Sequence, residues 1–451
     1  MQQLPRGCRI IEFPERTDER GSLSFAESMH HIPFQVERAF WVYGVPEGRT
    51  RGGHSHSETA EVVIPVTGSF KMMVDDGTRK AAVLMDSPTK GILIPPGVWC
   101  ELRDFSPGTV CVVFASHPYN ASGYIHDYSQ YLNEQLSVIR YDSSRRDEWN
   151  AFLKTSKNGT FLLDRGYMDY HSDRFTDSSL MFYKHGRLLA MLPANWCKDE
   201  GTVQSHGGLT YGGLIVQDSM IAVDALEVFS CAIDWMKHTL GAHRWLYKPI
   251  PYIYSRQPAE EDLYALFRSG GVLKQRGVSS VIDLKKPLPM RQSRKSGCVK
   301  ALKTGLRSDA GNMQEDLQAF WDILAGILQE KHGRKPVHSV DELRLLHSRF
   351  PDSIRLHVVR DGDRVVAGAL VYDMGQVVHT QYLASSDHGK KNGALDMLLH
   401  ELITVTYADR KYFDFGISTE NGGSYLNEGL IFQKEGFGAR SVVYDTYEMT
   451  F

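Results

Sequence analysis

Two histidines separated by one residue, His54 and His56, are the first group in the sequence that could do chemistry. Residues two apart on a strand point to the same face, so both rings would reach the interior of a β-barrel. Imidazole exchanges protons near neutral pH, which suits an acid–base pair. Gly52 and Gly53 allow a ligand to approach the backbone closely. The alternative is a solvent-facing pair near the end of a strand.

The same stretch carries side chains of the types that bind metals. Glu61 and Cys100 follow the histidine pair, and imidazole, carboxylate and thiolate groups together can hold zinc or iron. We expect no metal here. A site formed by His54, His56, Glu61 and Cys100 remains the alternative.

A loop with glycines and lysines precedes a predicted helix in the C-terminal half. His388, Gly389, Lys390, Gly393 and Ala394 lie in this loop. Free backbone N–H groups and the helix dipole favour an anion at such a position. The pyrophosphate of coenzyme A is the natural candidate, and an ordinary turn into a helix is the alternative.

Two further segments combine glycines with side chains that could bind a substrate. Residues 205–213 contain four glycines around Tyr211, which indicates either backbone close to a ligand or a glycine-rich strand at a domain seam. Asp414 lies in a turn after a buried-looking strand, and Lys434 follows in a loop rich in Gly and Phe. We expect Tyr211 and Asp414 to bind substrate. Lys434 would stabilise the oxyanion of acyl transfer, or be a solvated surface lysine.

Two histidines in the same half could act on an amine. We expect His338 to be a general base and His332 to bind substrate. Ser339 and Glu342 have the spacing of a capping box, which predicts a helix to about Arg349. The alternative is that His338 merely precedes that cap.

These groups must be positioned by two kinds of structure. Short strands rich in Val, Ile and aromatics fill residues 8–115, which is typical of a barrel or jelly roll. From about Ser137, apolar spacing predicts helices over 222–240, 313–330 and 395–407 and strands over 179–183, 188–193, 354–359 and 365–372. One core rarely serves 451 residues. We therefore expect a multidomain protein, with an all-β barrel over 1–134 and α/β units over 135–290 and 291–451.

The N-terminal motifs resemble those of the dTDP-4-keto-6-deoxyglucose 3,4-ketoisomerases, which are WxcM-like cupins. The matching segments within 8–132 are Asp18-Glu-Arg-Gly-Ser-Leu23, Ile32-Pro-Phe34, Arg51-Gly-Gly-His-Ser-His56, Val74-Asp-Asp-Gly77, Asp86-Ser-Pro88 and Pro96-Gly-Val-Trp99. The resemblance implies that His54 and His56 move a proton between C3 and C4 of a ketosugar without a metal. It also implies that Arg51 lies near the sugar or its diphosphate. We place Glu61, Trp99 and Cys100 among the substrate-binding residues.

A barrel that only binds a nucleotide sugar or dimerises is the alternative to an isomerase. The family has tyrosines where this chain has Phe40 and Trp41, and a histidine where it has Cys100. Each replacement removes a polar or titratable group from the expected pocket.

The C-terminal motifs resemble the Fem-like branch of tandem GNAT acyltransferases, which includes peptidoglycan aminoacyltransferases. Besides the segments above, Leu246-Tyr-Lys-Pro-Ile-Pro-Tyr252, His332-Gly-Arg-Lys-Pro-Val-His-Ser339 and Lys434-x-x-Phe437-Gly438 match within 137–451. The resemblance implies two GNAT-like units, an acyl-CoA donor (acetyl-CoA first) bound to the second unit, and a catalytic Lys434.

Composition excludes several classes of partner. A net charge of -3 argues against broad nucleic-acid binding, and no apolar run approaches the roughly 20 residues of a membrane span. The first residues lack the apolar stretch of a signal peptide, and the six cysteines have no paired spacing. We expect a cytoplasmic protein with free thiols that forms a homodimer through its barrel.

The two resemblances together predict an N-acyltransferase of a dTDP-linked 3-aminodeoxysugar fused to a ketoisomerase-like cupin. A ketoisomerase produces a 3-ketosugar, transamination converts it to an amine, and acylation caps that amine. The alternative is a non-catalytic cupin joined to an aminoacyl- or other acyltransferase of cell-envelope synthesis. One such enzyme would be a tRNA-dependent aminoacyl transferase.

Overall fold

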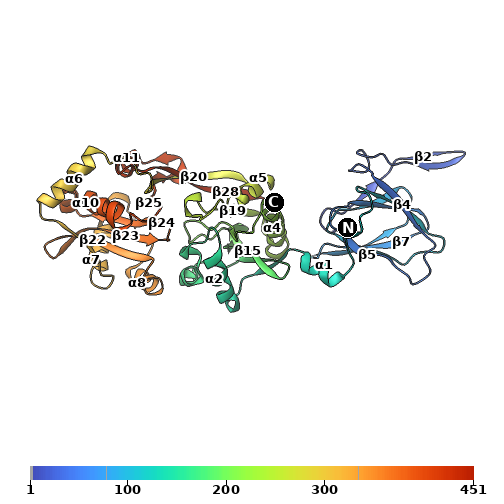
Figure 1. Ribbon diagram of the computed structural model, residues 1–451, viewed down its shortest axis with the longest axis horizontal. Coiled ribbons are helices and arrows are strands. Elements are labelled where there is room, and N and C mark those ends of the chain that lie inside the picture. The colour runs from blue at the N-terminus through green and yellow to red at the C-terminus, as the bar shows by residue number, and fades with distance from the viewer. Residues whose placement is uncertain (1–3, 78, 334) are drawn as a thin grey trace. The chain divides into compact units, whose positions relative to one another are not determined.

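The chain forms two compact units. A computed structural model describes residues 4–77, 79–333 and 335–451, with the backbone alone for 133, 331 and 332. Unit 1 is Met1–Ser137 with Tyr183–Arg187, and unit 2 is Val138–Phe182 with Leu188–Phe451 (Figure 1). The predicted domain boundaries after residues 134 and 290 stay predictions.

Unit 1 is built from two five-stranded sheets. The first has the order β1 (Arg9–Glu12), β9 (Lys90–Ile94), β6 (Glu61–Thr67), β11 (Val110–Ala115), β4 (Arg38–Tyr43). The second has the order β12 (Tyr124–Ile125), β5 (Arg51–His56), β10 (Trp99–Arg103), β7 (Phe70–Asp75), β8 (Lys80–Met85). A separate hairpin joins β2 (Glu15–Asp18) to β3 (Gly21–Ser24). Phe70 and Met72 of one sheet pack with Ile92 and Cys111 of the other in a buried core, which confirms the predicted all-β fold.

A short helix follows the strands of unit 1 along the chain. α1 spans Tyr128–Glu134, and the Asp127 side chain caps it by accepting a hydrogen bond from the N–H of Gln130. Tyr131 is buried and donates a hydrogen bond to the backbone oxygen of Asp75, 2.5 Å away. This contact fixes the helix on the end of β7, which pairs antiparallel with β8.

A ten-stranded sheet runs through unit 2. Its order is β16 (Asn195–Cys197), β17 (Thr202–Gln204), β19 (Arg244–Tyr247), β28 (Arg440–Thr450), β20 (Val272–Asp283), β25 (Tyr412–Ile417), β24 (Val377–Ser385), β23 (Arg364–Asp373), β22 (Ile354–Asp361), β21 (Arg307–Ala310). A four-stranded sheet has the order β13 (Ser137–Arg140), β14 (Leu180–Lys184), β15 (Arg187–Leu192), β18 (Ile215–Val216), and β26 (Thr419–Glu420) pairs with β27 (Tyr425–Leu426). In the large sheet the described pairs β17–β19 and β24–β25 are parallel. The last strand, β28, joins β19 to β20 and so makes one sheet from both halves of unit 2.

Unit 2 also contains α-helices, and the four that were predicted (over 222–240, 313–330, 395–407 and up to about Arg349) have bounds close to the prediction. The helices of this unit are α2 (Arg146–Thr155), α3 (Arg165–Met168), α4 (Ala222–Trp235), α5 (Glu261–Arg268), α6 (Gln292–Lys303), α7 (Leu317–His332), α8 (Val340–Arg349), α9 (Asp387–Lys391), α10 (Ala394–Glu401) and α11 (Glu428–Glu435). α4 and α10 each continue as a π-helical turn, Met236–Leu240 and Leu402–Thr406. α7 begins four residues later than predicted, because Asp316 accepts a hydrogen bond from the N–H of Asn312 in a turn before the helix.

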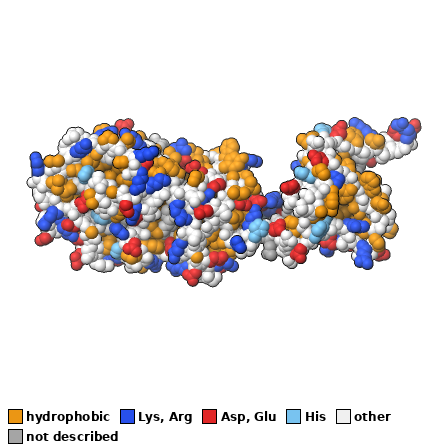
Figure 2. Space-filling model, in the orientation of Figure 1, with side chains coloured by type: hydrophobic (Ala, Val, Ile, Leu, Met, Phe, Trp, Pro, Cys, Tyr) orange, Lys and Arg blue, Asp and Glu red, His pale blue; other side chains and the backbone are white. Residues whose placement is uncertain are grey.

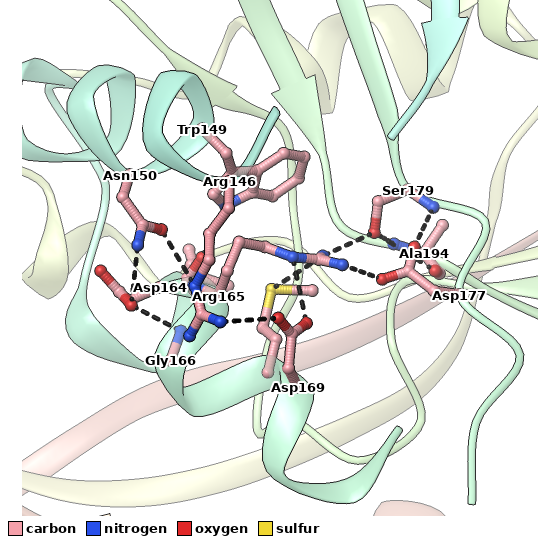
Figure 3. Close-up of polar contacts among 12 residues, drawn as sticks. Arg146, Trp149, Asn150, Asp164, Arg165, Gly166, Asp169, Asp177, Ser179 and Ala194 are labelled. Carbon is pink, nitrogen blue, oxygen red and sulfur yellow. Dashed lines mark hydrogen bonds and ion pairs between the residues drawn. The ribbon is translucent and has the colours of Figure 1, made fainter. Parts of the chain in front are cut away.

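A buried arginine holds the first half of unit 2 together. Arg165 is 2% exposed, and its guanidinium lies 3.5 Å from the ring centre of Tyr141. It pairs with Asp177 and with Asp169, whose Oδ1 is 3.2 Å from the Arg165 Nε (Figure 3). Two carboxylates and an aromatic face compensate the buried charge, so we interpret this group as structural.

Apolar side chains remain exposed on one face of unit 2. Tyr264 and Phe267 of α5 and Val272 at the start of β20 are each at least 46% exposed, and apolar side chains gather over these elements (Figure 2). In the described part of the chain, no helix has the length and apolar character needed to cross a membrane.

Candidate functional site

Four titratable residues of unit 1 lie close together at one face of β5. His54 and His56 lie two residues apart on this strand, and their ring centres are 4.8 Å apart. The Nε2 of His56 is 3.1 Å from the Oε1 of Glu61, and both residues are 5% exposed. Cys100 pairs in register with His54 on the neighbouring strand β10, which places it on the same face. The structure therefore brings four predicted residues together.

Burial governs the ionisation of this group. Desolvation lowers the pKa of His54, and the neighbouring His56 lowers it further. The Nε2 of His54 is buried and makes no hydrogen bond to any described residue. Burial also raises the pKa of the Cys100 thiol. The lowered pKa of His54 favours its neutral form, which can accept a proton, and the neighbouring His56 is bound to the Glu61 carboxylate.

The metal alternative has a geometric basis in the same group. Ligand atoms of His54, Glu61 and Cys100 lie within 4.8 Å of one another. Glu61 is also 3.5 Å from a guanidinium nitrogen of Arg38, a cation that would compete with a metal for the carboxylate.

Two predicted residues lie apart from the histidines. Trp99 pairs in register with Ser55, so its side chain lies on the face of the sheet opposite His54. Its ring packs against Tyr128 and Tyr131, with centres 5.1 and 5.4 Å away. Arg51 is exposed at the start of β5.

Unit 2 contains a buried aspartate–histidine pair. Asp414 on β25 and His379 on β24 are in register across the parallel pair, and the Asp414 Oδ2 is 2.8 Å from the His379 Nδ1. The hydroxyls of Tyr254 and Tyr444 donate to the same oxygen at 2.8 and 2.6 Å. Burial alone would raise the pKa of Asp414, but the adjacent His379 and hydrogen bonds from His379, Ser279 and Tyr444 hold it well below its usual range.

A cavity of about 570 Å³ opens beside this pair. The pairing of β24 with β25 ends at His379 and Asp414, and the residues that follow on both strands line the cavity. A bulge leaves Gln381 without a partner on β23, and Gln381 also lines the cavity. The described lining is Thr210, Lys248, Pro249, Gln275, Gly277, His379, Thr380, Gln381, Phe415, Gly416, Ile417, Thr419, Glu420, Asn421, Gly422, Gly423, Tyr444, Asp445 and Thr446.

Lys434 lies in helix α11 and not in the predicted loop. Asn427 caps this helix, so the glycines around it do not prevent a helix from forming. The Lys434 Nζ donates to the backbone oxygens of Gly416 and Ile417, both at 2.8 Å. Burial lowers its pKa to about 8, against the opposing effect of Asp414. The lysine is therefore buried against Gly416 and Ile417, which line the cavity, and is not a solvated surface residue.

The predicted position of Asp414 in a turn was also wrong. It lies inside the strand β25, with 0% of its side chain exposed, and not in a turn after the strand. A fully buried carboxylate that accepts several hydrogen bonds is better suited to orient His379 than to contact a substrate directly.

The other predicted substrate and base residues lie away from the cavity. Tyr211 is buried, with its hydroxyl 3.0 Å from that of Thr160, and its ring packs on Tyr254. The His338 Nδ1 is 2.6 Å from the Tyr382 hydroxyl, and burial lowers the pKa of this histidine to about 4. The side chain of His332 lies outside the described residues. Neither Tyr211 nor His338 lines a described cavity.

A second cavity of about 290 Å³ lies at the N-terminus of α10. It is lined by Arg294, Ser385, Lys390, Gly393, Ala394, Leu395, Asp396, Gly429, Phe432 and Gln433, which include three of the five predicted donor-binding residues. Gly393 has φ +76° and is the N-cap residue of this helix. Gly389 is buried in α9, and His388 pairs with Asp361 at 2.8 Å, so these two residues are outside the cavity lining.

The comparisons with known proteins separate the two units. Residues 6–136 match the family described as WxcM-like, C-terminal (FdtA). A TDP-4-oxo-6-deoxy-alpha-D-glucose-3,4-oxoisomerase of Aneurinibacillus thermoaerophilus is 33% identical over 123 residues, which are 27% of this chain and 88% of that protein. The chain belongs to this ketoisomerase family through unit 1. A crystal structure of a 3,4-ketoisomerase from Helicobacter canadensis is 34% identical, with a TM-score of 0.28 over 28% of this chain and 95% of that chain.

Unit 2 of this ketoisomerase-family chain carries a GNAT acetyltransferase domain. The domain matches residues 291–424, which contain His379 and Asp414 but end before Lys434. A crystal structure of FemX shares 13% identity and a TM-score of 0.51 over 70% of this chain and 97% of that chain. At that identity the likeness shows the fold, and it confirms the Fem-like architecture predicted for the C-terminal part.

Several residues that lie at the candidate sites were not predicted, in both the ketoisomerase-family unit and the unit with the GNAT domain. The Tyr124 ring lies 4.9 Å from His54 and 4.3 Å from His56, and it stacks on His126. Tyr124 and His126 repeat the spacing of the histidine pair, but a two-residue strand gives no pattern that could identify it. His379 lies in a strand with β-branched residues, and it pairs with a residue 35 positions away. Only the register of the strands reveals this partner.

Proposed function

We propose that this chain is a cytoplasmic enzyme that acylates the amine of a nucleotide-linked 3-aminodeoxysugar, fused to a sugar 3,4-ketoisomerase. The observation that carries the proposal is the Asp414–His379 pair beside the 570 Å³ cavity of a GNAT-containing unit. Unit 1 supplies the sugar class, because its relative is a TDP-sugar oxoisomerase. The six free thiols suit a reducing compartment.

His379 is the proposed general base. Its Nδ1 is bound to Asp414, so the Nε2 is free to take a proton from an amine in the cavity. The carboxylate fixes the tautomer and stabilises the imidazolium that forms. The donor supplies a thioester carbonyl, and the unpaired backbone of Gln381 and the ammonium of Lys434 are the candidates to stabilise its oxyanion.

The second cavity fits the phosphates of an acyl-CoA. Lys390 and Arg294 bring positive charge to the first turn of α10, where backbone N–H groups are free. Arg294 is bound to Asp396 at 2.7 Å, and a phosphate would compete for it. We propose that Gly393, Ala394 and Lys390 hold the pyrophosphate, with acetyl-CoA as the first donor to test.

In unit 1 we propose that His54 and His56 move a proton between C3 and C4 of the ketosugar. The buried His56–Glu61 contact and the neighbouring His54 support this role. Incubation with the TDP-4-ketosugar in deuterated water tests it, since proton transfer exchanges the hydrogen at C3. Binding of TDP without exchange would instead support a non-catalytic cupin.

The transferase is tested with the purified full chain. A TDP-3-aminodeoxysugar and acetyl-CoA should give an N-acetylated sugar and free coenzyme A, followed by thiol release and mass spectrometry. A folded His379→Gln variant should lower kcat by about 10²–10⁴-fold. A chain that acylates no TDP-aminosugar with any common acyl-CoA would contradict the proposal.

A further inference from the structure

A lysine from the first half of unit 2 faces the same cavity as His379. Lys248 follows β19 directly and lines the cavity wall. Its Nζ donates to the backbone oxygens of His206, at 2.9 Å, and of Leu209. Both acceptors lie in the glycine-rich segment 205–213, and the N–H of Gly212 donates back to the Lys248 oxygen at 3.0 Å. The ammonium is therefore held in place by the loop.

The charge of Lys248 has no counter-ion in the described part of the chain. No described carboxylate forms an ion pair with it, and its two partners are neutral carbonyls. Burial lowers its pKa to about 8, so the group is still charged at neutral pH. A partly buried cation without a counter-ion is unfavourable and is stabilised by an anion.

The other charges around the cavity are compensated or negative. Asp445 lines the cavity but is bound to Arg276, with its Oδ1 2.8 Å from the arginine Nε. Lys434 also donates hydrogen bonds to backbone oxygens, but the negative charge of Asp414 acts on its ammonium. Lys248 is the one lysine or arginine in the described lining. Lys248 is therefore the cationic side chain of the described lining that an anionic ligand in this cavity would contact.

We propose that Lys248 binds a phosphoryl group of the nucleotide-linked acceptor. An ammonium has three N–H groups, and the loop carbonyls occupy two of them, so one remains for an incoming oxygen. Lysine is a common phosphate ligand as a point charge. The neutral polar side chains of Gln275, Asn421 and Thr446 line the same space and suit the hydroxyls of a sugar.

This assignment rests on the proposed acyl transfer and makes it more specific. Phosphoryl groups are present in both substrates, the nucleotide sugar and the acyl-CoA. The structure favours the acceptor, because the cavity at α10 fits the donor phosphates and Lys248 belongs to the other cavity, beside His379.

Hydrogen–deuterium exchange of the full chain with TDP or with coenzyme A locates the phosphoryl site. We expect TDP to slow exchange in 205–213 and 419–423, independently of any binding to unit 1. Lys248→Met should need an about tenfold or more higher TDP concentration for the same protection, because a charge-assisted hydrogen bond is lost. The exposed Lys198→Met should bind like the wild type.

The outcomes separate this assignment from the proposed function. Protection of these segments by coenzyme A instead of TDP would overturn the acceptor assignment, and protection by neither ligand would overturn the anion site. A chain that shows Lys248-dependent protection by TDP but no acyl transfer would contradict the proposed reaction and leave the site standing. If Lys248→Met does not fold, the wild-type pattern alone decides.

Discussion

Asp414 and His379 face each other across two parallel strands, with the carboxylate oxygen 2.8 Å from the ring Nδ1. If this bond orients a general base, Asp414→Asn and His379→Gln should each lower kcat by about 10²–10⁴-fold. The KM for acetyl-CoA should change little, because the pair lies outside the cavity at α10. Steady-state kinetics of sugar acylation checks this.

The exposed His400 provides a matched control for the loss of an imidazole. His400→Gln should keep wild-type kcat. Equal losses in His379→Gln and His400→Gln would mean that the kinetics report general damage to the fold.

The fold was more predictable than the site. Segments rich in Val, Ile and aromatics identified residues 8–115 as β-structure. Period-3.6 apolar patterns identified helices such as α4 within a few residues, because burial of one face imposes this period. The helical position of Lys434 was missed, because Gly429 and Gly436 were interpreted as loop residues while the Asn427 cap was not considered.

The partners within each site depend on strand register, which no local pattern gives. His54, His56 and Glu61 were found because they are close in sequence and share a face. His379 and Asp414 meet only because β24 and β25 pair in parallel with one particular register. His338 has a residue type suited to catalysis, but it lies beside Tyr382 and not at a cavity.

Glu61→Gln tests the histidine pair of the ketoisomerase-family unit. The carboxylate lies 3.1 Å from the His56 Nε2, and a neutral amide would not stabilise a protonated ring. We expect the rate of deuterium exchange at C3 of the ketosugar to fall by about 10²-fold or more. Glu58→Gln changes an exposed glutamate nearby and should exchange at the wild-type rate.

Lys434 should impose a pH dependence on acylation. Burial lowers its pKa to about 8, so the cation is present below pH 8 and is lost as pH rises through this value. Arginine stays charged throughout, and the ratio of wild-type to Lys434→Arg activity cancels the ionisation of the acceptor amine. This ratio, measured from pH 6 to 10, should fall above pH 8, and a constant ratio would exclude a role for the lysine charge.

His338 should make the chain sensitive to acid. Its pKa falls from 6.5 to about 4 on burial, so the unfolded chain binds this proton at a higher pH than the folded chain. The stability it contributes is complete above pH 6.5 and is lost as pH falls toward 4, by about 3 kcal/mol at most. Urea unfolding of His338→Gln should therefore depend less steeply on pH in this window. An unchanged slope would show that other buried groups, such as His206, dominate.

Gly393 should be needed for both the fold and the donor site. Its φ of +76° costs an L-residue about 1–2 kcal/mol, and an added Cβ would lie 2.3 Å from the backbone oxygen of Gly297 in α6. Gly393→Ala should lower the free energy of unfolding by more than this and weaken acetyl-CoA binding, measured by denaturation and calorimetry. Gly326→Ala, in the exposed and open part of α7, should instead stabilise the chain by about 0.5–1 kcal/mol. Unaltered acetyl-CoA affinity in a folded Gly393→Ala variant would place the donor phosphates elsewhere.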